Sequence, residues 1–127
     1  MLRTWTIIGV TNVRRSLNWY QHLFGQPESE PAHDHFGQNT DADATVVLCL
    51  HRWGDHDHPT LRGPDQGRAG NGLLLFFRLD DFSSALLRSR SLVDALEKEP
   101  ELNPATGSEE FALLDPDGYY VMVSALS

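Results

Sequence analysis

The sequence predicts an α+β fold built from two successive βαβββ modules. Two observations lead to this prediction. Each half of the chain runs strand, helix and then strands, and a long segment without hydrophobic periodicity separates the halves. We place module one at about residues 1–54, the connecting loop at about 55–71 and module two at about 72–127, all within a single domain.

The composition is typical of a folded globular domain. Of the 127 residues 40% are hydrophobic and 22% charged, a balance that supports a core and argues against whole-chain disorder. The net charge of −8, without a block of Lys or Arg, argues against nucleic-acid binding. No apolar run approaches the roughly 20 residues of a membrane span. We therefore expect a cytoplasmic protein that has no signal peptide and binds no nucleic acid or membrane.

Module one is expected to begin with a β-branched and aromatic strand at residues 5–10. Asn12 is suited to cap the following helix, and Gly25 is suited to end it. The apolar side chains of that helix recur at helical spacing, at Val13, Leu17, Tyr20 and Phe24. A short strand is expected at about 36–39, followed by a buried strand at 44–51.

Module two repeats this order of elements. A buried strand is expected at residues 72–79, and Asp81 is suited to cap a helix that runs to about Glu97. The tail predicts a β-hairpin with strands at 111–114 and 119–124. The turn between them has the sequence Asp115-Pro116-Asp117-Gly118.

Three stretches carry a family resemblance. They are the segment from Val10 to Tyr20 (VTNVRRSLNWY) with Leu23-Phe24-Gly25, the junction Phe77–Phe82 (FRLDDF), and the segment Phe111–Tyr119 (FALLDPDGY). In this order they resemble the vicinal oxygen chelate superfamily, which includes glyoxalase I, bleomycin-resistance proteins and extradiol dioxygenases. The resemblance implies that the sheets of the paired βαβββ modules curl into a cup with the helices outside. It also implies a homodimer.

The resemblance assigns the metal ligands of metal-dependent members to four positions of this chain. These positions hold Trp5, Cys49, Leu74 and Met122. None of these side chains is a ligand for a hard metal ion, and their strand neighbours offer no His or Glu. We therefore expect no cofactor and no metal at these positions, and we do not expect the usual metal-dependent glyoxalase or dioxygenase chemistry.

The same replacements predict a dry, polarisable cup that suits a flat aromatic or aliphatic ligand. The period of two along the strands adds neighbours to the same faces. The expected ligand-binding residues are Trp5, Ile7, Cys49, His51, Trp53, Leu74, Phe76, Arg78, Tyr120 and Met122. Among them His51, Arg78 and Tyr120 are the expected polar anchors. The alternative is that these side chains fill the cup as core.

Five of the six histidines lie within residues 33–58. They are His33, His35, His51, His56 and His58. Three interpretations stay open for this segment: a solvated polar loop, a non-standard divalent-metal site that combines His51 with His56 or His58, and a loop that gates a ligand. Cys49 and His51 are about 7 Å apart along the strand, too far for a direct hydrogen bond. We therefore name no catalytic residue.

The leading hypothesis is a metal-independent small-molecule-binding protein that resembles the bleomycin-resistance type and binds an organic ligand as a homodimer. The alternative is a metal-dependent lyase or dioxygenase that uses His51, His56 and His58. A third possibility is a domain with a filled cup that serves only for dimerisation or partner binding. The sequence does not identify the ligand.

Overall fold

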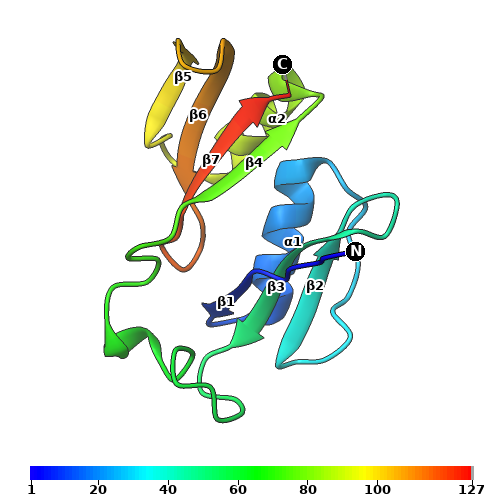
Figure 1. Cartoon of the computed structure of the whole chain (residues 1–127), viewed down its shortest axis with the longest axis vertical. Helices are drawn as coiled ribbons and strands as arrows, with labels where there is room; N and C mark the ends of the chain where they lie inside the picture. Colours follow the sequence, from blue (N-terminus) through cyan, green and yellow to red (C-terminus); the bar gives the residue numbers. More distant parts are fainter. Residues whose placement is uncertain (127) are drawn as a thin grey trace. The chain divides into compact units, whose positions relative to one another are not determined.

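The computed structural model describes residues 1–126, which contain two α-helices and seven strands (Figure 1). In chain order the elements are β1 (Ile7–Val10), α1 (Val13–Phe24), β2 (Phe36–Thr40), β3 (Val46–Arg52), β4 (Leu75–Leu79), α2 (Phe82–Leu92), β5 (Lys98–Asn103), β6 (Ser108–Leu114) and β7 (Tyr120–Ala125). The α+β class is confirmed. None of the helices in this range is long and apolar enough to cross a membrane.

The chain divides into two compact units. The first unit contains Met1–Gln21 and Pro27–Ala69, and the second contains His22–Gln26 and the chain from Gly70 onward. The last turn of α1 thus belongs to the second unit, where Phe24 packs edge-on against Phe77 of β4.

The sheet of the first unit has the strand order β1-β3-β2. Strand β1 runs parallel to β3, and β2 runs antiparallel to it. This sheet has three strands, one fewer than the four of a βαβββ module. The segment between α1 and β2 is mostly polar and contains Pro27 and Pro31, which lack the backbone N–H that a strand ladder requires.

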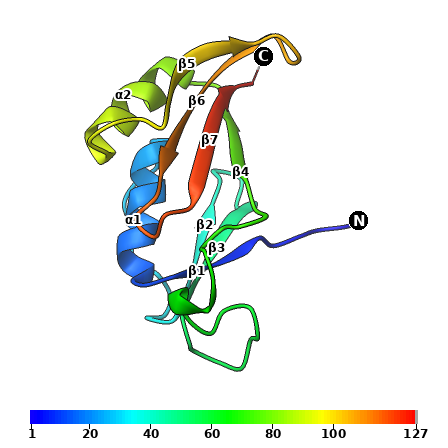
Figure 2. The same cartoon turned by 90° about the vertical axis from the view of Figure 1, so that its left-hand side faces the viewer.

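Helix α1 lies along one face of the first sheet (Figures 1 and 2). Its apolar side is buried as predicted, and alternate residues of β1 and β3 are buried with it. The largest buried side chains of this core are Val13, Leu17, Tyr20, Ile8, Val10, Leu48 and Leu50. The opposite face of the sheet is therefore left for other contacts.

The second unit is a complete βαβββ module with the strand order β4-β7-β6-β5. Strand β4 is parallel to β7, and the β7–β6 and β6–β5 pairs are antiparallel. Figure 2 shows α2 on one face of this sheet. The residues buried on that side include Leu75, Ala85, Ser89, Phe111, Leu113, Val121 and Val123.

Three predicted boundaries in the second unit are wrong, and one of them is the start of β6, which lies at Ser108 and not at residue 111. Helix α2 ends at Leu92 and not near Glu97, because Val93 is extended and the chain then forms β5. Pairing with β6 outweighs the polar composition of β5, which gives no strand signal in the sequence. Strand β4 begins at Leu75 and not at residue 72, since Gly72 has a φ of +87°, which does not fit a strand.

Both ends of α1 have the predicted capping residues. The side-chain oxygen of Asn12 accepts a hydrogen bond from the backbone N–H of Arg15 at 2.9 Å. Gly25 follows the helix with a φ of +72°, a conformation that glycine adopts without strain. The guanidinium of Arg88 donates to the Leu23 carbonyl at 3.2 Å, which satisfies one of the free carbonyls at this end.

We predict that Asn12→Ala lowers the free energy of unfolding by about 1 kcal/mol, because the N–H of Arg15 loses its acceptor. Urea denaturation followed by circular dichroism measures the change. Asn12→Ser keeps an acceptor at this position and should retain most of the stability. Equal stability of Asn12→Ala and the unsubstituted protein would contradict a capping role.

Candidate functional site

Three of the predicted binding residues, Ile7, Cys49 and His51, lie on strands β1 and β3 at the face of the first sheet opposite α1. Ile7 on β1 pairs with Cys49 on β3, and the next row along this face pairs Gly9 with His51. Strand β2 extends the two rows, because Cys49 pairs with Gln38 and His51 with Phe36. Residues paired in this way project to the same side of a sheet. The predicted alternation therefore holds on β1 and β3.

The residues of this face differ in exposure. Trp5 precedes β1 and is 55% exposed, and Ile7 is also exposed. Cys49 is fully buried, and burial raises the pKa of its thiol. The Gln38 side-chain amide lies 3.7 Å from the sulfur and opposes that rise only in part. Trp5 and Ile7 are therefore available to a ligand, whereas Cys49 is part of the core.

A pocket of about 400 Å³ lies beside Trp5, within the range of about 300–1,000 Å³ typical of ligand sites. The Trp5 and Phe36 rings have centroids 6.5 Å apart. The main lining residues are Trp5, Pro31, Ala32, His33, Phe36 and Gln38. Only Trp5 of these belongs to the predicted set. Phe36 and Gln38 could have been found by assigning faces to the predicted strand at 36–39.

Trp53 lies on the same face, directly over β1. A methyl group added at Gly9 would come within 2.4–2.6 Å of the Trp53 ring. The indole therefore packs directly against the backbone of Gly9. The Trp53 backbone N–H donates to the Val10 carbonyl at 3.1 Å. Its indole N–H is buried and has no hydrogen-bond partner among residues 1–126. Trp53 is thus held against the sheet and requires a glycine at position 9.

The second unit also has an apolar face, opposite α2. Phe76 pairs with Met122, which in turn pairs with Ala112 of β6. Phe76 is 41% exposed. Further exposed large apolar side chains on or next to this face include Leu74, Tyr120 and Leu114. Leu114, which pairs with Tyr120, is absent from the predicted set although the predicted hairpin register would have placed it there.

Arg78 belongs to the same face but is bound to its own chain. Its guanidinium donates to the hydroxyls of Ser124 and Ser108 at 3.2 and 3.4 Å. It also donates to the carbonyls of Ala125 and Leu126 at 3.1 and 2.7 Å. Arg78 therefore connects the end of β7 to β4 through its Nε and one terminal nitrogen of the guanidinium.

The structure brings together the three histidines of the alternative metal set. His51 is only 4% exposed, and its Nε2 lies 3.1 Å from Nδ1 of His56. One ring nitrogen from each of His51, His56 and His58 lies within 4.8 Å of the other two. His35 contacts His56 with ring centroids 5.0 Å apart, and His33 stacks on His35. His22 is outside this group and contacts Ser91.

Asp55 adjoins the histidine group and is held by Arg52. The Arg52 Nε donates to the carboxylate at 2.5 Å, and this hydrogen bond is the main cause that lowers the pKa of Asp55. Partial burial of the Asp55 carboxylate opposes this effect, and the charge of Arg52 lowers the pKa further. The carboxylate therefore stays ionised and is directed to Arg52.

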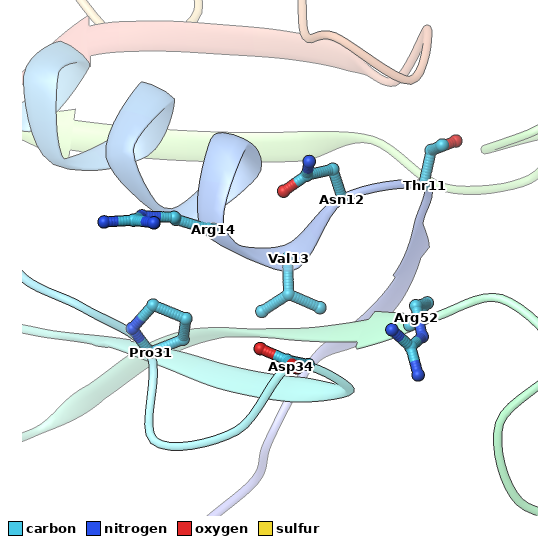
Figure 3. A pocket seen from close by; sticks show the side chains of 7 residues that line it. All are labelled: Thr11, Asn12, Val13, Arg14, Pro31, Asp34 and Arg52. Carbon is cyan, nitrogen blue, oxygen red and sulfur yellow. The ribbon is translucent and has the colours of Figure 1, made fainter.

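A second pocket of about 270 Å³ lies at the start of α1. Figure 3 shows Arg14 and Arg52 on opposite sides of Val13, with Asp34 and Pro31 facing them. Both guanidinium groups are already paired, Arg14 with Glu30 and Arg52 with Asp55. This pocket contains none of the predicted binding residues and offers less apolar surface than the pocket beside Trp5.

Solved structures of several proteins resemble the whole chain. A protein of unknown function from Agrobacterium tumefaciens str. C58 is 22% identical with a TM-score of 0.72, covering 100% of this chain and 95% of that one. A glyoxalase / bleomycin resistance protein from Catenulispora acidiphila DSM 44928 is 18% identical with a TM-score of 0.63, and both chains are covered completely. TioX from Micromonospora sp. ML1 is 14% identical with a TM-score of 0.70 and 98% coverage of each chain.

No match was found among curated proteins. At these identities the solved structures show a shared fold. The family model is more specific and matches residues 4–123, which is nearly the entire sequence. The chain therefore belongs to the Glyoxalase/Bleomycin resistance protein/Dioxygenase superfamily.

Proposed function

We propose that this protein binds a small organic molecule with a flat aromatic or aliphatic body, without forming a covalent bond to it. The observation that carries the proposal is the row of exposed apolar side chains on the sheet faces opposite the helices. Trp5 and Ile7 provide them in the first unit, and Leu74, Phe76 and Tyr120 provide them in the second. Exposed apolar patches of this kind mark binding surfaces more often than scattered single residues do.

The energetic argument rests on apolar area. Removing an aromatic or aliphatic side chain from water contributes about 1.5–3 kcal/mol when burial is complete. The rings of Trp5 and Phe36 also line the 400 Å³ pocket, with their centroids 6.5 Å apart and their planes tilted by 32°. A planar ligand placed there gains stacking in addition to buried area.

The chemistry of the strand positions supports binding rather than metal-assisted reaction. The four positions that carry metal ligands in metal-dependent relatives hold Trp5, Cys49, Leu74 and Met122. Indole, thiol, isobutyl and thioether groups do not fit a hard divalent ion, so we derive no reaction step through a metal there.

Charge narrows the class of ligand. The chain has a net charge of −8, which repels anions from its surface and favours neutral or cationic molecules. An apolar face disfavours a highly charged ligand of either sign. We therefore propose a neutral or singly cationic ligand. Assembly into a homodimer remains a prediction.

We predict that Trp5→Ala and Phe36→Ala each weaken the binding of Nile red, a neutral planar dye, by about tenfold, since each removes about 1.4 kcal/mol of apolar contact at the pocket of the first unit. Fluorescence titration of the full chain measures the dissociation constants. Leu87→Ala is the matched control, because Leu87 lies on α2 and is 73% exposed. If neither variant differed from the Leu87→Ala control, binding at this pocket would be refuted.

We also predict that the Cys49 thiol of the native protein reacts with a disulfide reagent at least about a hundredfold more slowly than the unfolded chain, because burial keeps it neutral and inaccessible. The raised pKa of Cys49 also determines the direction in which the stability of the protein changes with pH. Above the pKa of about 8.5 of an unfolded thiol, the unfolded state holds fewer protons, so stability falls as pH rises.

Release of the chromophore from Ellman's reagent, with and without guanidinium chloride, measures this protection. Cys49→Ser is the blank that reports reagent hydrolysis. Equal rates in the native and unfolded protein would show that Cys49 is accessible and would reopen a covalent role for it.

A further inference from the structure

We propose that His51, His56 and His58 bind one divalent transition-metal ion of the zinc class. The proposal goes beyond the binding of an organic ligand, and it uses none of the four strand positions where relatives hold metal. All three residues lie in the first unit, at the end of β3 and in the loop that follows it.

The positions of the nitrogens fit such an ion. Imidazole nitrogens bind zinc at about 2.0–2.1 Å, so two tetrahedral ligand atoms stand about 3.4 Å apart. His51 Nε2 and His56 Nδ1 are 3.1 Å apart, and all three ligand atoms lie within 4.8 Å of one another. Closing the widest of these separations, which is at most 4.8 Å, to about 3.4 Å would place all three nitrogens at bonding distance of a common point.

His51 is fixed in the tautomer that a metal requires. Its Nδ1 lies 2.9 Å from the backbone carbonyl oxygen of Arg52. A carbonyl oxygen only accepts, so Nδ1 carries a proton, and Nε2, which faces His56, is the nitrogen that is left for a metal. Metal-binding histidines characteristically donate their other N–H to a carbonyl or carboxylate in this way. Burial between strand neighbours, including Phe36 at 6.2 Å, holds the ring in place.

The loop is shaped to present the other two rings. The N–H of Gly54 donates to the Leu61 carbonyl at 2.8 Å, and the N–H of Leu61 donates to the His58 carbonyl at 3.0 Å. Between these bonds His56 has a φ of +65°, a left-handed conformation that is strained for a non-glycine residue. His56 is exposed, so burial of its side chain does not account for this strain.

The donor set selects the class of ion. Three neutral imidazoles suit Zn²⁺, Co²⁺, Ni²⁺ and Cu²⁺, whereas Mg²⁺ and Ca²⁺ prefer oxygen ligands. Asp55 is nearby, but its carboxylate is bound to Arg52. Three histidines leave the fourth tetrahedral position for water, and the exposure of His56 and His58 gives an ion a path of entry.

The test uses the full chain after treatment with a chelator. Isothermal titration with ZnCl₂ should give one ion per chain, and Co²⁺ should give the visible absorption of a tetrahedral complex. We expect His56→Ala and His58→Ala each to weaken Zn²⁺ binding at least about tenfold, as the loss of a ligand or its support does in metal sites. His33→Ala should stay within about twofold, which is within about 0.4 kcal/mol.

His33 is the matched control because it belongs to the same run of stacked rings but not to the convergent three. Absence of stoichiometric Zn²⁺ binding by the unsubstituted chain would overturn the proposal. Equal loss in His33→Ala and His58→Ala would also overturn it, since it would show diffuse binding by a histidine-rich surface.

A second pair of variants separates ligand loss from misfolding. His56→Gly removes a ligand and relieves the left-handed strain, so the metal-free protein should melt at the same or a higher temperature. Ala44→Gly relieves the same kind of strain at a φ of +70° in another loop and keeps all three histidines. Zn²⁺ should raise the melting temperature of Ala44→Gly but not that of His56→Gly. An equal rise in both variants would contradict the site.

Discussion

The parallel pairing of β1 with β3 is the constraint on which the first unit depends. It aligns Ile7 with Cys49 and Gly9 with His51, and it directs the alternate residues toward α1. A slip of one residue would turn Ile7 into the core and expose Ile8. The close fit of Trp53 over Gly9 also depends on this register, because a side chain at that position would overlap the indole. Both the apolar face and the position of His51 thus follow from one ladder.

The sequence predicts those parts of the fold whose signals are local. Asn12 and Gly25 mark the ends of α1 because a cap requires only nearby atoms. Strand β5 escapes prediction because Lys98–Asn103 is polar and becomes a strand only through pairing with β6. The end of α2 is misplaced for the same reason, since the apolar spacing continues past Leu92 while the chain turns to join the sheet.

The candidate sites likewise contain residues that local sequence signals predict and residues whose roles depend on tertiary contacts. Period-two alternation places Ile7, Phe76 and Met122 on sheet faces, and the structure agrees with their register. The histidine density of residues 33–58 and the alternative set His51, His56 and His58 are both visible in the sequence, but the approach of these three side chains to within 4.8 Å is not. It depends on the backbone of one loop. The structural role of Arg78 could not be predicted from the sequence. Its four hydrogen bonds, to β7, Ser108 and Leu126, join residues that are far apart in the chain.

A metal held by imidazoles at the end of β3 is compatible with an apolar sheet face. A carboxylate at Cys49 would place a charge in a position that is fully buried, at a cost that only a bound cation would offset. His51 is also buried, but a neutral imidazole with its Nδ1 proton on a backbone carbonyl carries a much smaller desolvation cost. The chain can therefore be stable and dry along Ile7 and Cys49 when no ion is bound. Loss of the usual ligands from the strands and the gathering of histidines in the loop are, on this argument, two consequences of keeping that face apolar.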